Sequence, residues 1–203
     1  MSEPTVAVGG GAATTATGGA RGRLLVAMGD AVRDAGLPRA TVAEVVRRAR
    51  TSRRTFYEHF EDRETCFLAL FDAYSEQLLE TVAHAAAGDD PWEERVDRAM
   101  AAYLAALALD PELTRSLLRE TPALGAQGAR RMQAMSDRWA QVLSRLVQEA
   151  SGDEHGPRPL STEAAIVITG GFRDLALVTL EQGRDPLELR PIGTDLIRRI
   201  TAR

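Results

Sequence analysis

The sequence contains no lysine, a single cysteine and only three histidines. One cysteine excludes an intrachain disulfide, and it excludes a zinc site built on several thiolates. His59, His84 and His155 lie far apart, and no H-x-x-x-H pair is present. A helical zinc site of that type is therefore not expected. We predict neither a bound metal nor another cofactor.

Long hydrophobic runs are also missing. No stretch approaches the roughly 18 apolar residues that a membrane span needs. The longest apolar tract, residues 164–172, contains a threonine and two glycines. The N-terminal region has no basic segment followed by an apolar one, so no secretion signal is expected. These absences favour a cytoplasmic protein without a membrane partner.

The charge of this 203-residue chain is unevenly distributed. Its net charge is −4, and all 25 basic residues are arginines. Arginine usage of this kind is typical of a GC-rich genome, but arginine also binds phosphate and guanine in a bidentate way. Residues 39–54 hold six arginines and one acid, Glu44. This basic segment indicates either a duplex-binding surface or a solvated helix face, and charge alone does not separate the two.

The pattern of apolar residues is helical from residue 21 onward, and no stretch alternates as a strand would. Residues 1–20 are mostly Gly, Ala and Thr, and we expect them to form a flexible tail. The predicted helices cover about 21–35, 41–49, 53–59, 62–87, 91–109, 111–122, 126–150, 161–182 and 191–202, with a possible extra turn at 186–189. The sequence therefore predicts an all-α fold of about nine helices.

Local signals set several of the helix starts. Thr41 and Glu44 form a capping box, and Ser52 is the expected cap of the next helix. Two later helices are each expected to begin at an Asp-Pro pair. In these pairs Asp90 or Asp110 caps the helix and the proline takes the first helical position.

The two short helices at 41–49 and 53–59 are separated by about three residues, which is the spacing of a helix-turn-helix. The first has an apolar face, and the second has one apolar anchor, Phe56. Around that anchor lie Arg53, Arg54, Thr55, Tyr57, Glu58 and His59. Such a helix fits the major groove of DNA, where arginine contacts guanine and threonine contacts the methyl group of thymine.

About residues 21–70 resemble the DNA-binding domain of the tetracycline-repressor (TetR) family, with the matching positions in residues 36–64. The most specific part is the string T-F-Y-E-H-F at residues 55–60, followed by Arg63-Glu64. Two positions depart from the family pattern. Arg50 stands where the turn usually has glycine, so either the turn differs slightly or strain is accepted. Arg63 replaces the usual lysine and keeps its charge.

The resemblance implies an N-terminal three-helix DNA-binding domain at residues 21–65 and a helical ligand-binding and dimerisation domain at 66–203. It also implies roles for individual residues. Arg53, Arg54, Thr55 and His59 would lie at the groove, Tyr57 and Arg63 would contact phosphates, and Thr41 would cap its helix and touch the DNA backbone.

The predicted helix at 161–182 is apolar on nearly every side, since only Arg173 and Asp174 are charged between residues 164 and 180. A helix of this kind needs two packing partners. The resemblance implies that one partner is a second subunit, which Gly170 and Gly171 would allow to approach closely. Arg173 and Asp174 would pair across the dimer, lie at its rim or meet a polar group of a ligand.

The resemblance further implies a small-molecule pocket inside the C-terminal bundle. The candidates are large residues on inward-facing stripes, each of which could equally be plain core. They are Tyr74, Met100, Tyr103, Met135, Trp139 and Phe172.

These expectations add up to a transcriptional regulator, and the resemblance to the TetR family implies a repressor rather than an activator. It would bind a palindromic operator in double-stranded DNA as a homodimer and be released by an apolar effector. Two alternatives remain at this point. A helical ligand carrier or scaffold without specific DNA binding would share the C-terminal features. An enzyme is the other, although the sequence has no Gly-x-Ser-x-Gly, P-loop or dinucleotide-binding motif.

Overall fold

The structure is a computed structural model that describes residues 19–151 and 156–202. All regular elements in these two segments are helical, which confirms the predicted all-α fold. The helices are α1 (Ala20–Ala35), η1 (Leu37–Arg39), α2 (Val42–Arg48), α3 (Arg53–His59), α4 (Arg63–Ala86), α5 (Trp92–Leu109), α6 (Pro111–Ala123), α7 (Gly125–Ala150), α8 (Thr162–Glu181), η2 (Pro186–Leu189) and α9 (Arg190–Thr201). The predicted tail at 1–20 lies almost wholly outside the described residues.

Most of the predicted helix starts are confirmed. The hydroxyl of Thr41 accepts a hydrogen bond from the backbone N–H of Glu44, and Ser52 and Asp110 cap α3 and α6 in the same way. Each cap satisfies a backbone donor that the first helical turn leaves free. The extra turn at 186–189 is present as η2.

The predicted cap at Asp90 is wrong. Pro91, with ψ of 142°, occupies the N-cap position of α5, and no side chain caps the helix. The carboxylate of Asp90 instead pairs with Arg98 at 2.9 Å. Arg98 also donates to carbonyl groups at the end of α4, so a contact between two helices has replaced the local cap.

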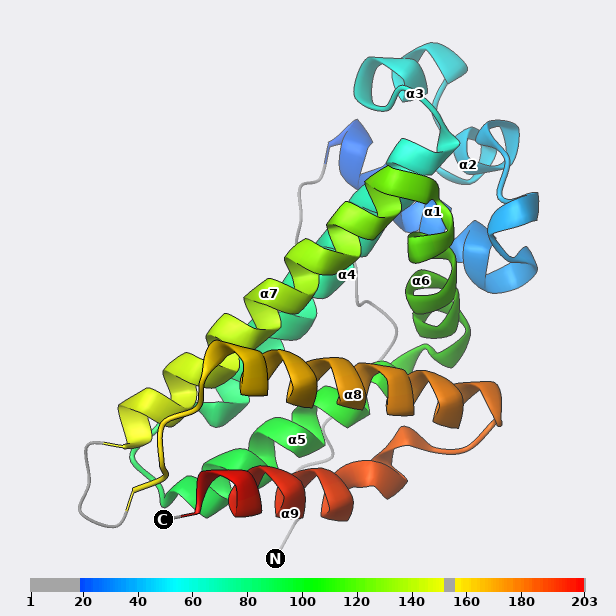
Figure 1. Cartoon of the computed structure of the whole chain (residues 1–203). Coiled ribbons are helices and arrows are strands. Elements are labelled where there is room, and N and C mark those ends of the chain that lie inside the picture. Colours follow the sequence, from blue (N-terminus) through cyan, green and yellow to red (C-terminus); the bar gives the residue numbers. More distant parts are fainter. Residues whose placement is uncertain (1–18, 152–155, 203) are drawn as a thin grey trace, which may run out of the picture.

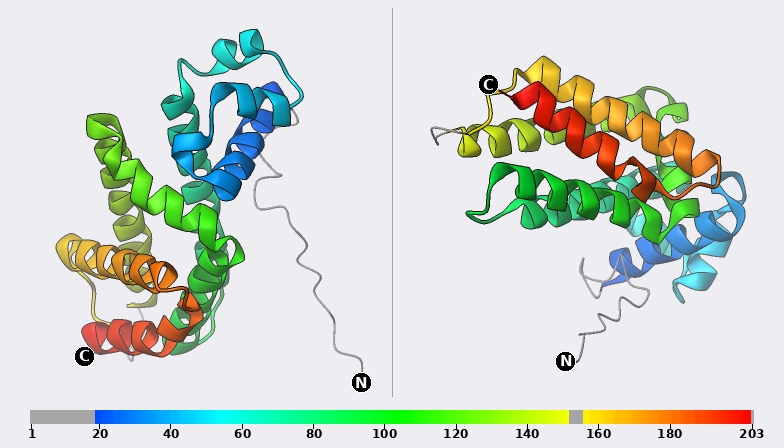
Figure 2. Two further views of the ribbon diagram at one scale, coloured as in Figure 1. Left: turned by 90° about the vertical axis from the view of Figure 1, so that its right-hand side faces the viewer. Right: turned by 90° about the horizontal axis from the view of Figure 1, so that it is seen from below.

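The elements form two ends joined by long helices (Figure 1). The short helices α1, α2 and α3 lie at one end, while α5, α8 and α9 lie at the other (Figure 2). Helices α4 and α7 run side by side between these ends. Two ion pairs, Asp72–Arg131 and Glu76–Arg138, link their surfaces.

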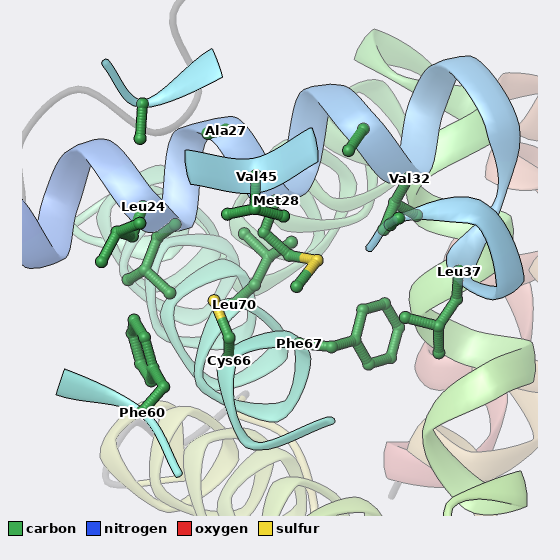
Figure 3. Close-up of a cluster of buried hydrophobic side chains, with 14 of the residues drawn as sticks. Leu24, Ala27, Met28, Val32, Leu37, Val45, Phe60, Cys66, Phe67 and Leu70 are labelled. Carbon is green, nitrogen blue, oxygen red and sulfur yellow. The ribbon is translucent and has the colours of Figure 1, made fainter. Parts of the chain in front are cut away.

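Each end of the molecule has its own hydrophobic core. The first is built from α1, the helix-turn-helix and the start of α4, and its fully buried side chains include Leu24, Met28 and Phe67 (Figure 3). Leu113 and Leu117 of α6 also belong to it. The second core joins α5, α8 and α9 to the later part of α4. Because α4 is one continuous helix with side chains in both cores, a division of the chain at residue 65 stays a prediction.

Cys66 belongs to the first core and is fully buried, and burial raises the pKa of its thiol to about 12. The thiolate is the reactive form of cysteine. We therefore expect the native protein to resist thiol reagents at pH 8 and to be labelled fully once it is unfolded in denaturant. Mass spectrometry of the labelled chain measures this, and fast labelling under native conditions would contradict the burial of Cys66.

Within the described residues, no helix is long and apolar enough to cross a membrane. The same residues contain no cluster of three or more histidine, cysteine or acidic side chains that could hold a metal ion.

Candidate functional site

The turn between α2 and α3 has a tight, left-handed backbone. Arg50 has a φ of 50°, and it is the one residue other than glycine in the described segments with a positive φ. The N–H of Thr51 donates to the carbonyl of Val46, and the N–H of Arg50 donates to Arg47. This pair of bonds is a Schellman motif, in which glycine usually takes the position of Arg50. The turn therefore keeps its usual shape, with Arg50 in a conformation that is uncommon for its type.

Helix α3 is anchored from one side and exposed on the other. Phe56 is fully buried and meets Tyr57 edge to face, with 5.4 Å between ring centroids. Tyr57 itself is 58% exposed. Arg53, Arg54 and His59 are also exposed, while Thr55 is half-buried.

Ion pairing divides the arginines of this surface into two groups. Glu44 accepts hydrogen bonds from Arg47 and Arg48, which lower its pKa to about 2, and Arg54 pairs with Glu58 at 3.1 Å. Arg39, Arg50 and Arg53 have no ionic partner within the described part of the chain. These three cations stay available for an anionic ligand.

The other predicted DNA contacts have roles within the protein. Thr41 is exposed, and its hydroxyl caps α2. The hydroxyl of Thr55 lies 3.0 Å from that of Ser52, the cap of α3. Nη1 of Arg63 donates to the carbonyls of Leu37 and Pro38, both at 3.2 Å, which ties η1 to the start of α4. Contacts of these side chains with DNA stay predictions.

A cavity lies in the C-terminal part of the molecule, between α4, α5, α7 and α8. Its volume is about 110 Å³. Among its lining residues are all six predicted pocket residues: Tyr74, Met100, Tyr103, Met135, Trp139 and Phe172. That these residues contact a ligand stays a prediction.

Three aromatic side chains, Tyr74, Tyr103 and Trp139, bring polar groups to the cavity wall. Tyr103 meets Trp139 edge to face with 5.4 Å between centroids, and burial raises the pKa of the Tyr103 hydroxyl. Tyr74 lies 2.7 Å from the hydroxyl of Thr114, which donates to the carbonyl of Leu107. Thr114 therefore accepts the bond from Tyr74. Because Tyr74 also packs against both cores, it connects the cavity with the first core.

The predicted dimer residues lie on α8. Gly171 faces open space, and no atom lies within 4 Å of a methyl group added there. Arg173 binds Asp174 of the same chain, with 3.0 Å from Nε to Oδ1, and donates to Ser136 at 2.9 Å. Arg173 also lines the cavity. The structure thus shows this pair within one chain, and its role in a dimer stays a prediction.

Sequence reasoning missed most of the apolar surface around these residues. Val167 is 73% exposed and Ile192 of α9 is 60% exposed. Helices α8 and α9 lie at the same end of the molecule (Figure 2). The exposed apolar residues at helical spacing on the two are Val167, Leu175, Val178, Ile192, Leu196 and Ile200. We call this set the α8–α9 face. Ile192, Leu196 and Ile200 are spaced by four residues, so the sequence does show that they share one side of α9. It does not show whether another helix packs against that side.

Comparison with known families supports the predicted resemblance of the N-terminal region to the TetR family. Residues 32–70 match the family described as "Bacterial regulatory proteins, tetR family". A search of curated protein sequences gives no significant match.

Solved structures of the same fold are numerous. The fatty acid degradation regulator FadR from Bacillus halodurans is 17% identical with a TM-score of 0.72, over 86% of this chain and 95% of that one. FadR from Bacillus subtilis, solved with stearoyl-CoA, is 16% identical with a TM-score of 0.72 and the same coverage. A regulatory protein in the tetR family from Rhodococcus RHA1 is 17% identical with a TM-score of 0.68, over 92% of this chain and 98% of that one.

The family match covers the helix-turn-helix, and the structural likeness extends over both ends of the molecule. Residues 32–70 therefore match the TetR family of bacterial regulatory proteins, and the chain shares its fold with solved proteins of that family.

Proposed function

We propose that this protein binds a palindromic operator as a homodimer, represses transcription and is released by an apolar small molecule. The observation that carries DNA binding is the exposed face of α3, where Arg53 stands free of any ionic partner in the described structure. Arginine without a competing carboxylate can bind guanine in a bidentate way. A carrier or scaffold would have no need for a free cation on this helix.

The α8–α9 face supports the dimer. Large apolar side chains gathered on one exposed surface mark an interaction site. A second copy of the same face would cover it in a two-fold symmetric interface, which is the commonest arrangement of soluble oligomers. Two-fold symmetry also suits a palindromic operator, whose half-sites lie about 34 Å apart.

The cavity supports regulation by a ligand. Its walls include α4, the helix that begins directly after the helix-turn-helix, and Tyr74 joins α4 to α6. A ligand that binds better to one arrangement of α4 would shift the position of the DNA-binding helices by its difference in affinity. One neighbour of the same fold, FadR from Bacillus subtilis, was solved with stearoyl-CoA, whose acyl chain is apolar.

The test is binding to the intergenic DNA beside the protein's own gene, at several salt concentrations and with competitor DNA. We expect saturable binding that weakens with salt, because bound phosphates release counterions. Arg53→Ala should weaken it about 10-fold or more, since a good base contact contributes about 1–3 kcal/mol. Tyr57→Phe should weaken it less, through a lost phosphate contact.

Arg145→Ala is the matched control, because Arg145 is an exposed arginine in the later part of α7. It should leave operator affinity unchanged. Wild-type affinity in Arg53→Ala would remove this residue from the site. Binding no better than that to random DNA, both here and in a genome-wide selection of bound fragments, would favour the carrier or scaffold alternative.

A further inference from the structure

The apolar cavity adjoins a second, charged pocket on the molecule. The second pocket is lined by Asp89, Arg145 and Glu149 among others. Only Arg95, Val142 and Leu146 line both spaces. We call these three residues the neck, because an elongated ligand in the cavity could reach the second pocket between them.

Arg95 is the free cation of the cavity wall. Its Nε donates to the carbonyl of Ala86 at 2.8 Å, at the end of α4, and its remaining N–H groups have no partner in the described structure. The other arginine of the wall, Arg173, is already bound by Asp174 and Ser136. A half-buried guanidinium with free donors beside an apolar space favours an anionic acceptor.

The cavity is long and narrow. Its lining residues on α4 run from Phe71 to Ala86, which corresponds to about 22 Å of helix at about 1.5 Å per residue. Its volume of about 110 Å³ is below the roughly 300–1,000 Å³ of common ligand pockets. A flexible chain that threads between side chains fits such a space better than a rigid ring system does. Met100 and Met135 in the wall are adaptable side chains that can give way to it.

The second pocket carries charges of both signs. Asp89 and Glu149 oppose Arg145, so a large polyanionic head group there would meet two carboxylates. A free carboxylate on Arg95 brings one negative charge toward these two carboxylates, where a head group with several phosphates would bring more. The balance of charges therefore favours a free carboxylate over a head group with several phosphates.

We infer that the cavity takes an unbranched fatty acid, with the acyl chain between α4, α5 and α7 and the carboxylate on Arg95. This inference rests on the proposed function, in which the cavity binds an effector, and it specifies the chemical class of that effector. Two kinds of molecule carry an acyl chain with an anionic end: the free fatty acid and its coenzyme A thioester. The thioester would place a neutral group at the neck and its phosphates beyond it.

Fluorescence gives a direct readout, because Trp92 and Trp139 both line the cavity and are the only two tryptophans of the chain. The full-length protein is titrated with dodecanoate, dodecanol and dodecanoyl-CoA. We expect dodecanoate to bind more tightly than dodecanol. Arg95→Gln should weaken dodecanoate about 10- to 100-fold, the equivalent of one charge-assisted bond, and leave dodecanol unchanged.

Arg130→Gln is the matched control, because Arg130 is an exposed arginine of α7 that lines neither space, and it should not change the affinity for dodecanoate. Arg95→Lys keeps the cation, so it should retain a preference for dodecanoate over dodecanol. Arg95→Lys also decides the test if Arg95→Gln fails to fold, since loss of the preference in the folded lysine variant would contradict a role for the charge.

Other outcomes separate this inference from the proposed function. Equal binding of dodecanoate and dodecanol to the wild type would overturn the role of Arg95 and leave an apolar effector cavity in place. If only dodecanoyl-CoA binds tightly, and Arg145→Gln weakens that binding, the ligand is the thioester and the proposal of a free fatty acid is overturned. Binding of none of the three would overturn the fatty-acid class, while operator binding and its release by other apolar compounds would still test the proposed function.

Discussion

Gly128→Ala is expected to lower the free energy of unfolding by about 2–3 kcal/mol, near the upper end of the cost of overpacking. A methyl group added at Gly128, in the first turns of α7, would lie 1.8 Å from the carbonyl oxygen of Thr121 and 2.9 Å from its carbonyl carbon. Both are backbone atoms of α6 and cannot turn aside as a side chain can. The two helices would have to move apart, which outweighs the roughly 1 kcal/mol that alanine gains in helix propensity.

Denaturant titration measures this loss, and thermal unfolding should show a melting temperature lower by about 5–10 °C. Gly29→Ala is the matched control, since a methyl group added at this position of α1 meets only side-chain atoms of Leu70 and Leu113, at 3.8 Å or more. It should not destabilise the folded chain. A Gly128→Ala variant as stable as the wild type would show that α6 and α7 do not approach this closely.

Introducing a carboxylate on both helices of the α8–α9 face, with Val167→Asp and Ile192→Asp, is expected to give a monomer that still folds. Both side chains are more than half exposed within one chain, so aspartate there is solvated in the monomer. In the proposed dimer the same groups would be buried without partners, which costs several kcal/mol. Operator affinity should then fall about 100-fold or more, because two linked half-site contacts become independent ones.

Sedimentation at several protein concentrations measures the oligomeric state, and the operator assay measures the second effect. Leu109→Asp is the control, because Leu109 is 62% exposed at the end of α5 and lies outside the α8–α9 face. It should leave both properties unchanged. A double variant that is still dimeric would place the interface elsewhere, and a wild type that is monomeric at every concentration would contradict the proposed dimer.

Several features could be predicted from the sequence because short-range chemistry decides them. The caps at Thr41, Ser52 and Asp110 depend on backbone N–H groups three residues away. The turn at Arg50 follows from the spacing of two short helices. The resemblance implied a pocket in the C-terminal part, helical spacing then named six large residues as its candidates, and all six line one cavity.

Other features depend on which surfaces the fold brings together. Asp90 was expected to cap α5, but Arg98, which also binds the end of α4, offers its carboxylate a better partner. The limited room at Gly128 comes from the approach of α6, and the exposure of Ile192 comes from the absence of a covering element. Arg95 carries no sequence motif, and only the meeting of α4, α5 and α7 places it at the neck of the cavity.

The sequence by itself determined the helices, the caps at Thr41, Ser52 and Asp110 and the helix-turn-helix, since these depend on contacts within a few residues along the chain. Tertiary structure alone decided which cations stay unpaired, which apolar faces stay uncovered and where the cavity opens toward a charged pocket. Those properties depend on the relative positions of residues far apart in sequence, such as Arg95 and Leu146, and local periodicity carries no information about such positions.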